Sequence, residues 1–329
     1  MRTRYIAIGL VAAFAAPVRP SALTAQEVTS APVETRVPVA GASLYARVVG
    51  RGQPVIVLHG GPDFDQAYLL PELDRLANSY RLIYYDQRGR GRSAEGVRAE
   101  DVTLASDIND IEQVRQHFQL DTVTLLGHSW GTVLALEYAV RHPEHVSRLI
   151  LMNPAPASAA DLATFRKAYL EKLGPDMDRQ RAIVATPAYR EGDPAAVTAR
   201  YRIHFKPALV RLDDYERLMT RMQADFYSQG KAGILKARAV EDRLMRDTWQ
   251  LPGYDLLPKL RGLHIPTLVI VGDHDFIPVD IANHIAQAVP DAKLLVIKDC
   301  GHFSYLECAD DVRRALPHGS HRLAQPLLK

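Results

Sequence analysis

The sequence lacks an excess of charge of either sign, a long apolar run after its first 25 residues, an internal repeat and a low-complexity segment. Its 40 basic and 38 acidic residues give a formal net charge of +2. Neither sign is gathered in a block, which argues against a nucleic-acid partner, because such proteins usually concentrate Lys and Arg on one face. No later stretch is apolar over the roughly 20 residues that a membrane-spanning helix needs. With 47% hydrophobic residues, ordinary for a globular protein, the 329-residue chain can bury a large core in one or two domains.

Residues 1–25 have the order of a secretory signal peptide. Arg2 and Arg4 make a positive start, Tyr5–Ala16 carries no charge, and small residues lead to Ala25. The apolar run is too short to span a bilayer. An uncleaved N-terminal anchor and a disordered leader are the alternatives, and the cleavage position stays open. The sequence therefore predicts an exported protein, periplasmic or secreted, with no stable membrane association after cleavage.

The chain has only two cysteines, Cys300 and Cys308. In an exported protein they could form a disulfide, but the sequence does not establish the geometry, so the pairing stays open. Cys300 also lies two residues before a candidate base, His302, which makes a thiol nucleophile a second possibility. Because no histidine arrangement supports a thiol as well as one supports a serine, a structural role is favoured.

The first half of the chain alternates predicted strands and predicted helices. Continuous apolar runs bounded by turn residues indicate buried strands, and apolar spacings of three and four indicate helices. The alternation implies a mostly parallel sheet with helices on both faces, joined by right-handed crossovers. The predicted strands span 33–39, 44–50, 54–59, 81–86, 123–126 and 148–153, and the predicted helices span 71–78, 103–118 and 132–141.

The pattern changes after residue 155. For about 100 residues the chain is rich in Ala, Arg, Leu and Asp, contains several prolines and has no obvious buried strand. Predicted strands return at 267–271 and 293–297, with a helix between them. We therefore predict a signal peptide at 1–25, an α/β core formed by 26–155 and 257–329, and an inserted helical cap at 156–256.

The segment Gly127-His128-Ser129-Trp130-Gly131 fits the pattern G-x-S-x-G and lies between a predicted strand and a predicted helix. A sharp strand-to-helix turn of this kind holds its serine in strained backbone geometry, and only small neighbours avoid a clash there. Gly127 and Gly131 supply that space. An ordinary strand–helix turn is the alternative, but the setting favours Ser129 as a nucleophile.

A serine hydroxyl needs a base to remove its proton. Of the twelve histidines, position favours His302, since it follows the last predicted strand, where a loop at the carboxyl edge of the sheet can reach the nucleophile. An ordinary loop histidine is the alternative. Two acids after the preceding strand could orient the base: Asp275, deeper in the turn, is the first choice and Asp273 the alternative. The order Ser129, Asp275, His302 is the one expected for a G-x-S-x-G nucleophile on a strand-to-helix turn.

Two backbone N–H groups are predicted to form an oxyanion hole. Trp130 opens a helix, and N–H groups at a helix N-terminus are free to bind a developing negative charge. In the segment Gly60-Gly61-Pro62 the glycines let the backbone approach a substrate, and Gly61 can donate whereas Pro62 has no N–H. A simple tight turn is the alternative for this segment. The pattern predicts no metal site.

These motifs resemble the proline iminopeptidase branch of the α/β-hydrolases. The resemblance rests on His59–Pro62, Asp86–Ser93, Gly127–Gly131 and the helix from Asp107 to Phe118. It implies an α/β-hydrolase fold, a helical cap over the nucleophile and an acyl-enzyme mechanism without metal or organic cofactor. That family removes an N-terminal residue, often proline, from peptides.

The resemblance covers both parts of the core, roughly 34–155 and 255–315, but the sequence departs from the family pattern at three points. Asp63 stands where the family usually has glycine, and His128 stands where glycine is common. Trp249 is the only tryptophan of the cap, so the family's paired tryptophans followed by glutamate are missing. The departures concern substrate recognition and leave the hydrolytic core intact.

The resemblance further implies acidic cap residues that hold the ammonium group of a substrate. Glu216 and Glu241 are the favoured substrate-binding residues, because they lie in the second half of the cap among aromatic and apolar residues. The other candidates are Glu171, Glu191, Asp213, Asp214, Asp225 and Asp242.

Three functions compete. The first is an exported aminopeptidase on small peptides or amino-acid amides, and the second is a carboxylesterase or lactonase with the same acyl chemistry. The third is a catalytically silent binding protein of this fold, against which the complete set of Ser129, Asp275 and His302 argues. A haloalkane dehalogenase or epoxide hydrolase would need an aspartate in place of Ser129. The sequence leaves the oligomeric state open.

Overall fold

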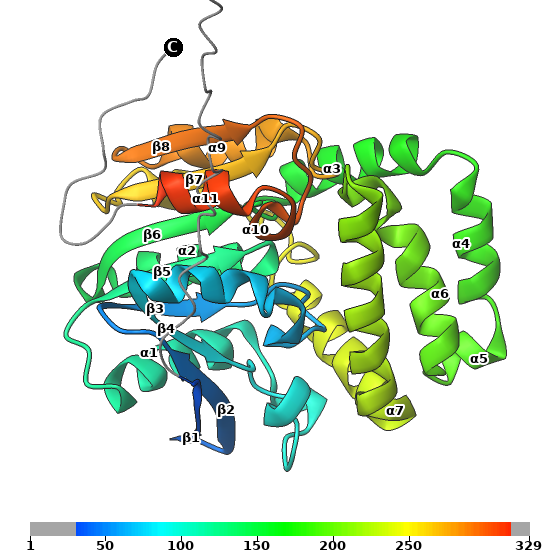
Figure 1. Ribbon diagram of the computed structural model, residues 1–329, viewed down its shortest axis with the longest axis horizontal. Coiled ribbons are helices and arrows are strands. Elements are labelled where there is room, and N and C mark those ends of the chain that lie inside the picture. The colour runs from blue at the N-terminus through cyan, green and yellow to red at the C-terminus, as the bar shows by residue number, and fades with distance from the viewer. Residues whose placement is uncertain (1–30, 317–329) are drawn as a thin grey trace, which may run out of the picture.

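Eight strands form one sheet in the order β1-β2-β4-β3-β5-β6-β7-β8 in the computed structural model, which describes residues 31–316 (Figure 1). The signal peptide predicted at 1–25 lies outside the described residues. The strands are β1 (Val33–Val39), β2 (Ala42–Val49), β3 (Gln53–Leu58), β4 (Tyr80–Tyr85), β5 (Val123–His128), β6 (Val146–Met152), β7 (Thr267–Gly272) and β8 (Ala292–Ile297).

The sheet is mostly parallel, as predicted. The hairpin strands β1 and β2 pair antiparallel with each other, and β2 pairs antiparallel with β4. All neighbours from β4 to β8 pair in parallel. Every residue of β5 and β7 is buried, because parallel strands covered on both faces bury side chains of both orientations.

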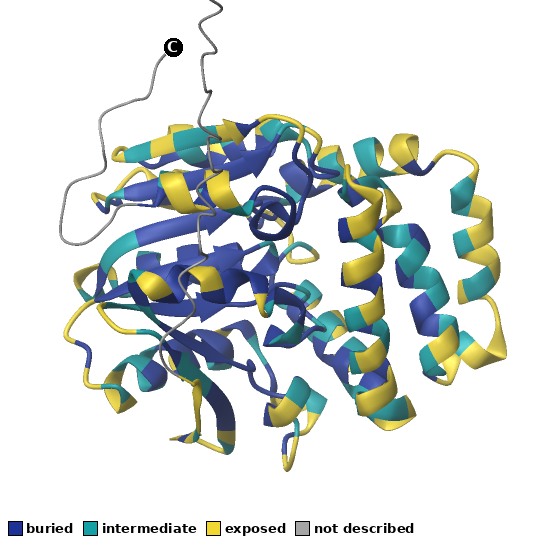
Figure 2. Cartoon of the chain, in the orientation of Figure 1, coloured by how far each residue is buried: buried dark blue, intermediate teal, exposed yellow. Residues whose placement is uncertain are grey.

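Helices cover both faces of the sheet. The helices α1 (Leu104–His117), α2 (Trp130–Arg141) and α9 (Val279–Ala288) contribute apolar side chains to the core on one face. On the other face lie the short helix α11 (Ala309–Ala315) and Glu72–Asn78. The segment 71–78, predicted as a short helix, is a 3₁₀ helix over Glu72–Asn78. The central strands of the sheet are mostly buried, whereas the edge strands and the outer faces of the packed helices are partly exposed (Figure 2).

Of the six α-helices between β6 and β7, the short α8 (Leu257–Leu260) packs against α2 and α9, and the other five stand to one side of the sheet (Figure 1). No residue in this insertion belongs to a named strand, which agrees with its predicted helical character. Together they form the cap: α3 (Ala159–Leu173), α4 (Asp176–Val184), α5 (Pro187–Arg190), α6 (Pro194–His204) and α7 (Leu212–Asp247), the last kinked at Gly230, where φ is 62°. Across residues 31–316, no helix has the length and apolar character required to cross a membrane.

The carboxyl ends of the parallel strands carry the predicted site residues. Gly60-Gly61 follows β3, Ser129 follows β5, Asp275 follows β7 and His302 follows β8. Ligand sites of open α/β sheets form at this edge, because the loops from several strands converge there. The fold therefore brings together residues that lie far apart along the chain: Asp275 and His302 are 27 positions apart, and His128, directly before Ser129, is 174 positions from His302.

Candidate active site

Ser129 occupies a strained turn between β5 and α2. Its φ of 52° and ψ of −121° are unusual for a residue with a side chain, and strain of this kind is found at functional sites. A methyl group on Gly127 would overlap the backbone of Gly131, and one on Gly131 would overlap the carbonyl oxygen of Leu58. The two flanking glycines are therefore required sterically, as the motif predicted.

His302 and Asp275 meet at the edge of the sheet. The Nδ1 atom of His302 lies 2.9 Å from Oδ1 and 3.1 Å from Oδ2 of Asp275, and each residue is only 2% exposed. The alternative acid, Asp273, instead contacts His274 at 2.7 Å and Lys298 at 3.3 Å. The geometry thus selects Asp275 over Asp273. An imidazole whose Nδ1–H is bonded to a carboxylate presents Nε2 as the basic nitrogen.

Asn153, which sequence reasoning did not single out, links the acid loop to the base loop. Its Nδ2 donates to Oδ2 of Asp275 at 2.9 Å and to the carbonyl oxygen of Gly301 at 3.0 Å. Its Oδ1 accepts from the hydroxyl of Ser304 at 2.6 Å. The backbone of Asn153 has a φ of 47°, a conformation that Asn tolerates better than most residues. An asparagine directly after a buried strand was the available signal.

The predicted oxyanion donors lie beside the nucleophile. Trp130 is the first residue of α2, and the first N–H groups of a helix have no partner within it. Gly61 has a φ of 108°, a conformation in which L side chains are strained. The Cβ of a residue at Gly60 would lie 3.0 Å from Cβ of Ser129, so this turn passes directly against the serine. Gly61, Ser129 and Trp130 all line one cavity.

His128 joins three parts of the site through one chain of hydrogen bonds. Its Nε2 lies 3.0 Å from the carbonyl oxygen of His302, and its Nδ1 lies 2.7 Å from the hydroxyl of Tyr68. A carbonyl only accepts, so Nε2 carries the hydrogen of the neutral ring and Tyr68 must donate to Nδ1. The Tyr68 oxygen in turn accepts from N–H of Gly60 at 2.7 Å. The chain therefore runs in one direction from the oxyanion turn to the base loop.

The environment keeps His128 neutral. Burial lowers its pKa well below the ordinary value, and the nearby His302 lowers it further. Its ring also packs 5.1 Å from the ring of His302, centroid to centroid, and 5.6 Å from that of Phe303. A protonated His128 would have two donors and no acceptor for Tyr68, so the hydrogen bond from Tyr68 to His128 would be lost. His128 is thus a candidate for a residue that positions the base loop, a role that the sequence motif alone did not reveal.

We expect His128→Leu and Tyr68→Phe each to lower kcat by about tenfold to a hundredfold with little change in KM, because they disturb the alignment of reacting groups. His128→Gln should recover most of the activity, since an amide can donate to the His302 carbonyl and accept from Tyr68. Steady-state kinetics measure these values. Tyr85→Phe is the matched control, because the buried Tyr85 hydroxyl has no hydrogen-bond partner among the described residues. Equal losses in His128→Gln and His128→Leu, with Tyr68→Phe fully active, would show that the hydrogen bonds through His128 and Tyr68 do not position the catalytic groups.

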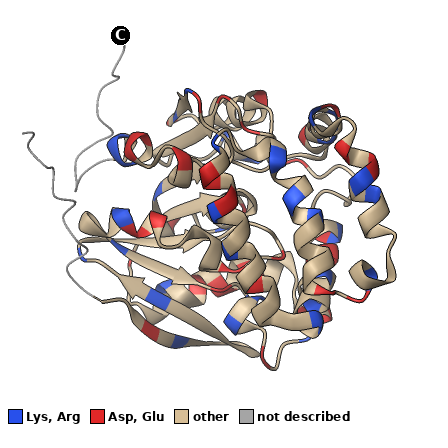
Figure 3. Cartoon of the chain, turned by 45° about the vertical axis from the view of Figure 1, so that its right-hand side comes forward, with Lys and Arg blue, Asp and Glu red and all other residues tan. Residues whose placement is uncertain are grey.

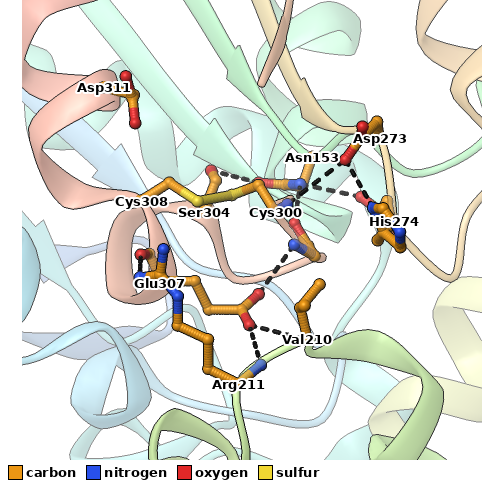
Figure 4. The surroundings of a disulfide bond; sticks show 12 residues. Asn153, Val210, Arg211, Asp273, His274, Cys300, Ser304, Glu307, Cys308 and Asp311 are labelled. Carbon is orange, nitrogen blue, oxygen red and sulfur yellow. Dashed lines mark hydrogen bonds and ion pairs between the residues drawn. A yellow bond between two sulfur atoms is a disulfide. The ribbon is translucent and has the colours of Figure 1, made fainter. Parts of the chain in front are cut away.

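The base loop is tied down covalently and by hydrogen bonds (Figure 4). A disulfide joins Cys300 to Cys308, with their Cα atoms 6.3 Å apart, and so closes the loop that carries His302. This settles the pairing that the sequence left open and removes Cys300 as a candidate thiol nucleophile. Oε2 of Glu307 accepts from N–H of Gly301 at 2.8 Å.

The same loop is anchored to the cap segment that follows α6. Oε1 of Glu307 accepts from N–H of Val210 at 2.7 Å and of Arg211 at 2.9 Å. The N–H of His302 donates to the carbonyl oxygen of Ala208 at 2.7 Å. The position of the base therefore depends on the cap as well as on the sheet.

A cavity of about 220 Å³ lies between Ser129 and the cap. Core residues and cap residues line it together, so a substrate would be enclosed by both. Most of its wall is apolar or aromatic, as is usual for small-molecule sites. The apolar and aromatic residues include Phe64, Leu162, Phe165, Tyr201, Phe205, Met245, Trp249, Phe276 and Phe303.

Charged side chains in this cavity come from Asp63, Glu241 and two arginines, Arg166 and Arg200. Oδ2 of Asp63 accepts from the hydroxyl of Tyr201 at 2.5 Å. Burial raises the pKa of Asp63, and the Tyr201 hydroxyl opposes that shift. Burial, together with the charge of Asp63, raises the pKa of Glu241 to about 8, although Arg200 acts in the opposite direction.

Of the two acids predicted from the cap, the cavity contains Glu241 but not Glu216. The half-exposed carboxylate of Glu216 accepts from Arg202 at 3.0 and 2.8 Å. The structure corrects the prediction for Glu216: the residue lies on the outward side of α7, where an ion pair with α6 stabilises it in solvent. Asp63, noted only as a departure from the family pattern, takes its place in the cavity.

One group in the described part of the chain could offer metal ligands, and it lies apart from the cavity. The ligand atoms of Glu112, His142 and His145 are within 4.8 Å of one another. His142 follows the C-terminus of α2, about 20 Å along that helix from Ser129 at a rise of about 1.5 Å per residue. The Glu112 carboxylate is already bonded to Arg115, Tyr138 and Gln116. Because these hydrogen bonds already use the Glu112 carboxylate, the three residues form a poor metal site.

The comparisons with known proteins agree with this geometry. A family model described as the alpha/beta hydrolase fold matches residues 53–309. The proline iminopeptidase of Heyndrickxia coagulans is 28% identical over 258 residues, which cover 78% of this chain and 87% of that protein. The solved structure of a proline iminopeptidase-related protein from Thermus thermophilus is 26% identical, with a TM-score of 0.66, and the alignment covers 87% of this chain and 96% of that one.

A further solved structure shares only the fold. Est816, described as an N-acyl homoserine lactone degrading enzyme, is 20% identical with a TM-score of 0.63, and the alignment covers 85% of this chain and 98% of that one. Similar folds thus support more than one acyl chemistry. With the sheet order, the inserted helices and the family match all in agreement, the chain belongs to the α/β-hydrolase fold family and is a distant homologue of the proline iminopeptidases.

Proposed function

We propose that this protein is a serine hydrolase that works through an acyl-enzyme on Ser129. His302 takes the proton of the Ser129 hydroxyl as the oxygen attacks a carbonyl carbon. Asp275 holds the imidazole by its Nδ1–H and stabilises the imidazolium that forms. The N–H groups of Gly61 and Trp130 bind the negative oxygen of the tetrahedral intermediate.

The second half of the reaction returns the enzyme to its starting state. His302 gives its proton to the leaving amine or alcohol, and the carbonyl–leaving-group bond breaks to leave the acyl group on Ser129. A water molecule, deprotonated by His302, then attacks the ester, and His302 returns the proton to Ser129 as the acid product leaves. No step of this cycle calls for a metal or an organic cofactor.

For the substrate we propose the N-terminal residue of short peptides or amino-acid amides. The observation that carries this choice is the pair of carboxyl groups, Asp63 and Glu241, in the wall of the cavity that contains Ser129. Carboxylates in a low-dielectric cavity attract an ammonium group strongly. The volume of about 220 Å³ suits a small acyl group. The curated relatives named proline iminopeptidase support the same class.

The test compares prolyl- and alanyl-arylamides with a free amine, the same arylamides after N-acetylation, and short-chain aryl esters. We expect the free-amine arylamides to be cleaved and acetylation to lower kcat/KM at least a hundredfold, because the acetylated nitrogen carries no charge. At pH 9, where the Glu241 carboxyl is an anion, Glu241→Gln should lower kcat/KM for free amines about tenfold. The exposed neighbouring change Asp242→Asn is the matched control and should leave it nearly unchanged.

Measuring kcat/KM of wild type and of Glu241→Gln across pH isolates the contribution of the Glu241 carboxyl. Its pKa is raised to about 8, so the group is protonated below pH 8 and becomes an anion above it. The ratio of kcat/KM between wild type and Glu241→Gln should therefore rise as pH increases through 8, because the titration of the substrate amine cancels in the ratio. A ratio that stays flat from pH 6 to 9 would exclude Glu241 from ammonium binding.

A carboxylesterase or lactonase is the second candidate, favoured by the apolar side chains of Leu162, Phe165, Met245 and Phe276 in the cavity wall. Such a wall accepts an uncharged acyl group without any ionic contact. In the substrate comparison, cleavage of aryl esters alone, with no turnover of any arylamide, would reject the aminopeptidase and leave this candidate.

We further propose that the protein is exported. Residues 1–25 have the charge and apolar order of a secretory leader. A disulfide between Cys300 and Cys308 fits an oxidising compartment, where such bonds persist.

A further inference from the structure

The cap contains a second cavity, which the proposed hydrolysis does not use. It has a volume of about 760 Å³ and is lined by all five cap helices and the residue after α4. Arg200 of α6 lines both this cavity and the one that contains Ser129. The lining residues are Tyr169, Leu170, Leu173, Met177, Gln180, Arg181, Val184, Ala185, Tyr189, Arg190, Arg200 and Arg238.

The charge of this second cavity has one sign. Four arginines line it, Arg181, Arg190, Arg200 and Arg238, and no Asp or Glu does. Over residues 31–316, only Arg181 of the four has a carboxylate within 4.0 Å, that of Asp178 at 3.5 Å. The surface of the cap otherwise carries acidic and basic residues on the same helices (Figure 3). The one-sided charge is therefore a property of the cavity and not of the whole cap.

Two of these guanidinium groups have hydrogen-bonding capacity to spare. Nε of Arg200 and Nη2 of Arg238 are buried without a hydrogen-bond partner in the described part of the chain. Arg238 lies over the ring of Tyr189, 3.9 Å from its centroid, and Arg200 over that of Tyr201, at 4.4 Å. Nη1 of Arg238 donates to the carbonyl oxygen of Tyr189 at 2.6 Å, but its Nη2 and Nε of Arg200 stay unpaired, and a buried donor left unpaired costs free energy. An anion that reached these donors after a small rotation of the side chains would remove that cost.

The rest of the lining is apolar and partly open to solvent. Leu170 is 44% exposed and Val184 is 40% exposed, and both belong to the small set of exposed large apolar residues within residues 31–316. Leu173 and Met177 continue the apolar wall. A ligand that covered these side chains would gain the free energy of burying apolar surface.

We propose that the cap cavity binds a carboxylate carried by an apolar body. The two carboxylate oxygens pair with the two unpaired donors, Nε of Arg200 and Nη2 of Arg238, because hydrogen bonds between a guanidinium and a carboxylate are strengthened by charge. The apolar body lies against Leu170, Val184 and the neighbouring side chains. This site is distinct from the ammonium site and carries the opposite charge.

Arg200 couples the two cavities. Its charge lowers the pKa of both Asp63 and Glu241 across the wall that it shares with the catalytic cavity. A carboxylate bound on the other side of Arg200 offsets part of that positive charge. A cationic substrate and an anionic cap ligand therefore favour each other's binding, and the effect is reciprocal.

The test uses 3-phenylpropionate as the probe and uncharged 3-phenylpropanamide as its matched control. Isothermal titration calorimetry on the full-length protein should detect the acid and not the amide. Because a carboxylate could also enter the catalytic cavity as a product mimic, the titration is repeated on protein labelled at Ser129 with a fluorophosphonate. Binding to the labelled protein should persist with a Kd within about threefold of the unlabelled value.

Variants then locate the site. Arg238→Gln should raise the Kd of the probe at least tenfold, as expected when a charged hydrogen bond is lost. Arg246→Gln, an exposed change on the same helix outside the cavity, should leave it unchanged, and circular dichroism checks that both variants fold. Binding that is lost on labelling and kept in Arg238→Gln would place the probe in the catalytic cavity and overturn the proposal. Absence of binding to wild type, or equal binding of the amide, would also overturn it, whatever the outcome for hydrolysis.

Discussion

Ser129→Ala is expected to lower kcat/KM by about five to six orders of magnitude, because removing the nucleophile of an acyl-transfer site leaves only the contributions of binding and the oxyanion donors. The variant should also lose all labelling by a fluorophosphonate. The substitution removes one oxygen atom. The backbone of the turn, with φ of 52° at this residue, is held by Gly127, Gly131 and the start of α2, which the substitution leaves unchanged. The folded state should therefore survive, with at most a small change in the unfolding midpoint.

The measurement is the kcat/KM of purified variant on an arylamide and on an aryl ester, with thermal unfolding recorded in parallel. Ser228→Ala, an exposed change on α7, is the control and should match wild type on all counts. Retention of labelling and of most of the activity in Ser129→Ala would place the nucleophile elsewhere and end the proposed mechanism.

Asp275→Asn is the second change with a large expected effect, a loss of about 10⁴ in kcat, which corresponds to about 5.5 kcal/mol of transition-state stabilisation. An amide next to Nδ1 of His302 can donate a hydrogen bond, so the ring adopts the tautomer that carries its hydrogen on Nε2 and can no longer accept the serine proton. The side chain would keep its volume and its place between Asn153 and Ile277, whose groups donate to Asp275 now. KM should change much less than kcat.

Asp273→Asn provides the matched control for this prediction. Asp273 lies two residues away in the same loop, but its carboxylate contacts His274 and Lys298, which are exposed. We expect its kcat to stay within about threefold of wild type. If Asp273→Asn were the inactive variant and Asp275→Asn the active one, the assignment of the orienting acid would be reversed.

The core and its catalytic constellation could be predicted because each part has a local signature. Continuous apolar runs mark buried parallel strands, and the glycines around Ser129 fit a local sequence pattern, although the space at Gly131 is restricted by Leu58 on a neighbouring strand. His302 and Asp275 could be chosen because each directly follows a strand, and parallel strands deliver their loops to one edge. Asp275 was separated from Asp273 only by its depth in the turn, and the contact with His302 agrees with that choice.

The recognition residues could not be predicted in the same way. Whether an acid on a cap helix faces the cavity depends on how that helix is rotated against the core, and the hydrophobic pattern leaves this rotation loosely defined. Glu216 and Glu241 lie on the two halves of α7, before and after the kink at Gly230, and one pairs with Arg202 in solvent whereas the other lines the cavity. Asp63 was missed because its motif suggested a turn. Asn153 was missed because its position directly after a buried strand does not show which distant loops its side chain bridges.

The anchoring of the base loop by the cap has a consequence for engineering. Ala208 accepts from His302, and Val210 and Arg211 donate to Glu307, so part of what holds the imidazole in place is backbone that belongs to the insertion. A lid grafted from another hydrolase to alter selectivity would have to reproduce one acceptor and two donors at these positions. Chimeras joined between Phe205 and Leu212 would disturb that contact, whereas exchanges confined to α4 and α5 would leave it intact.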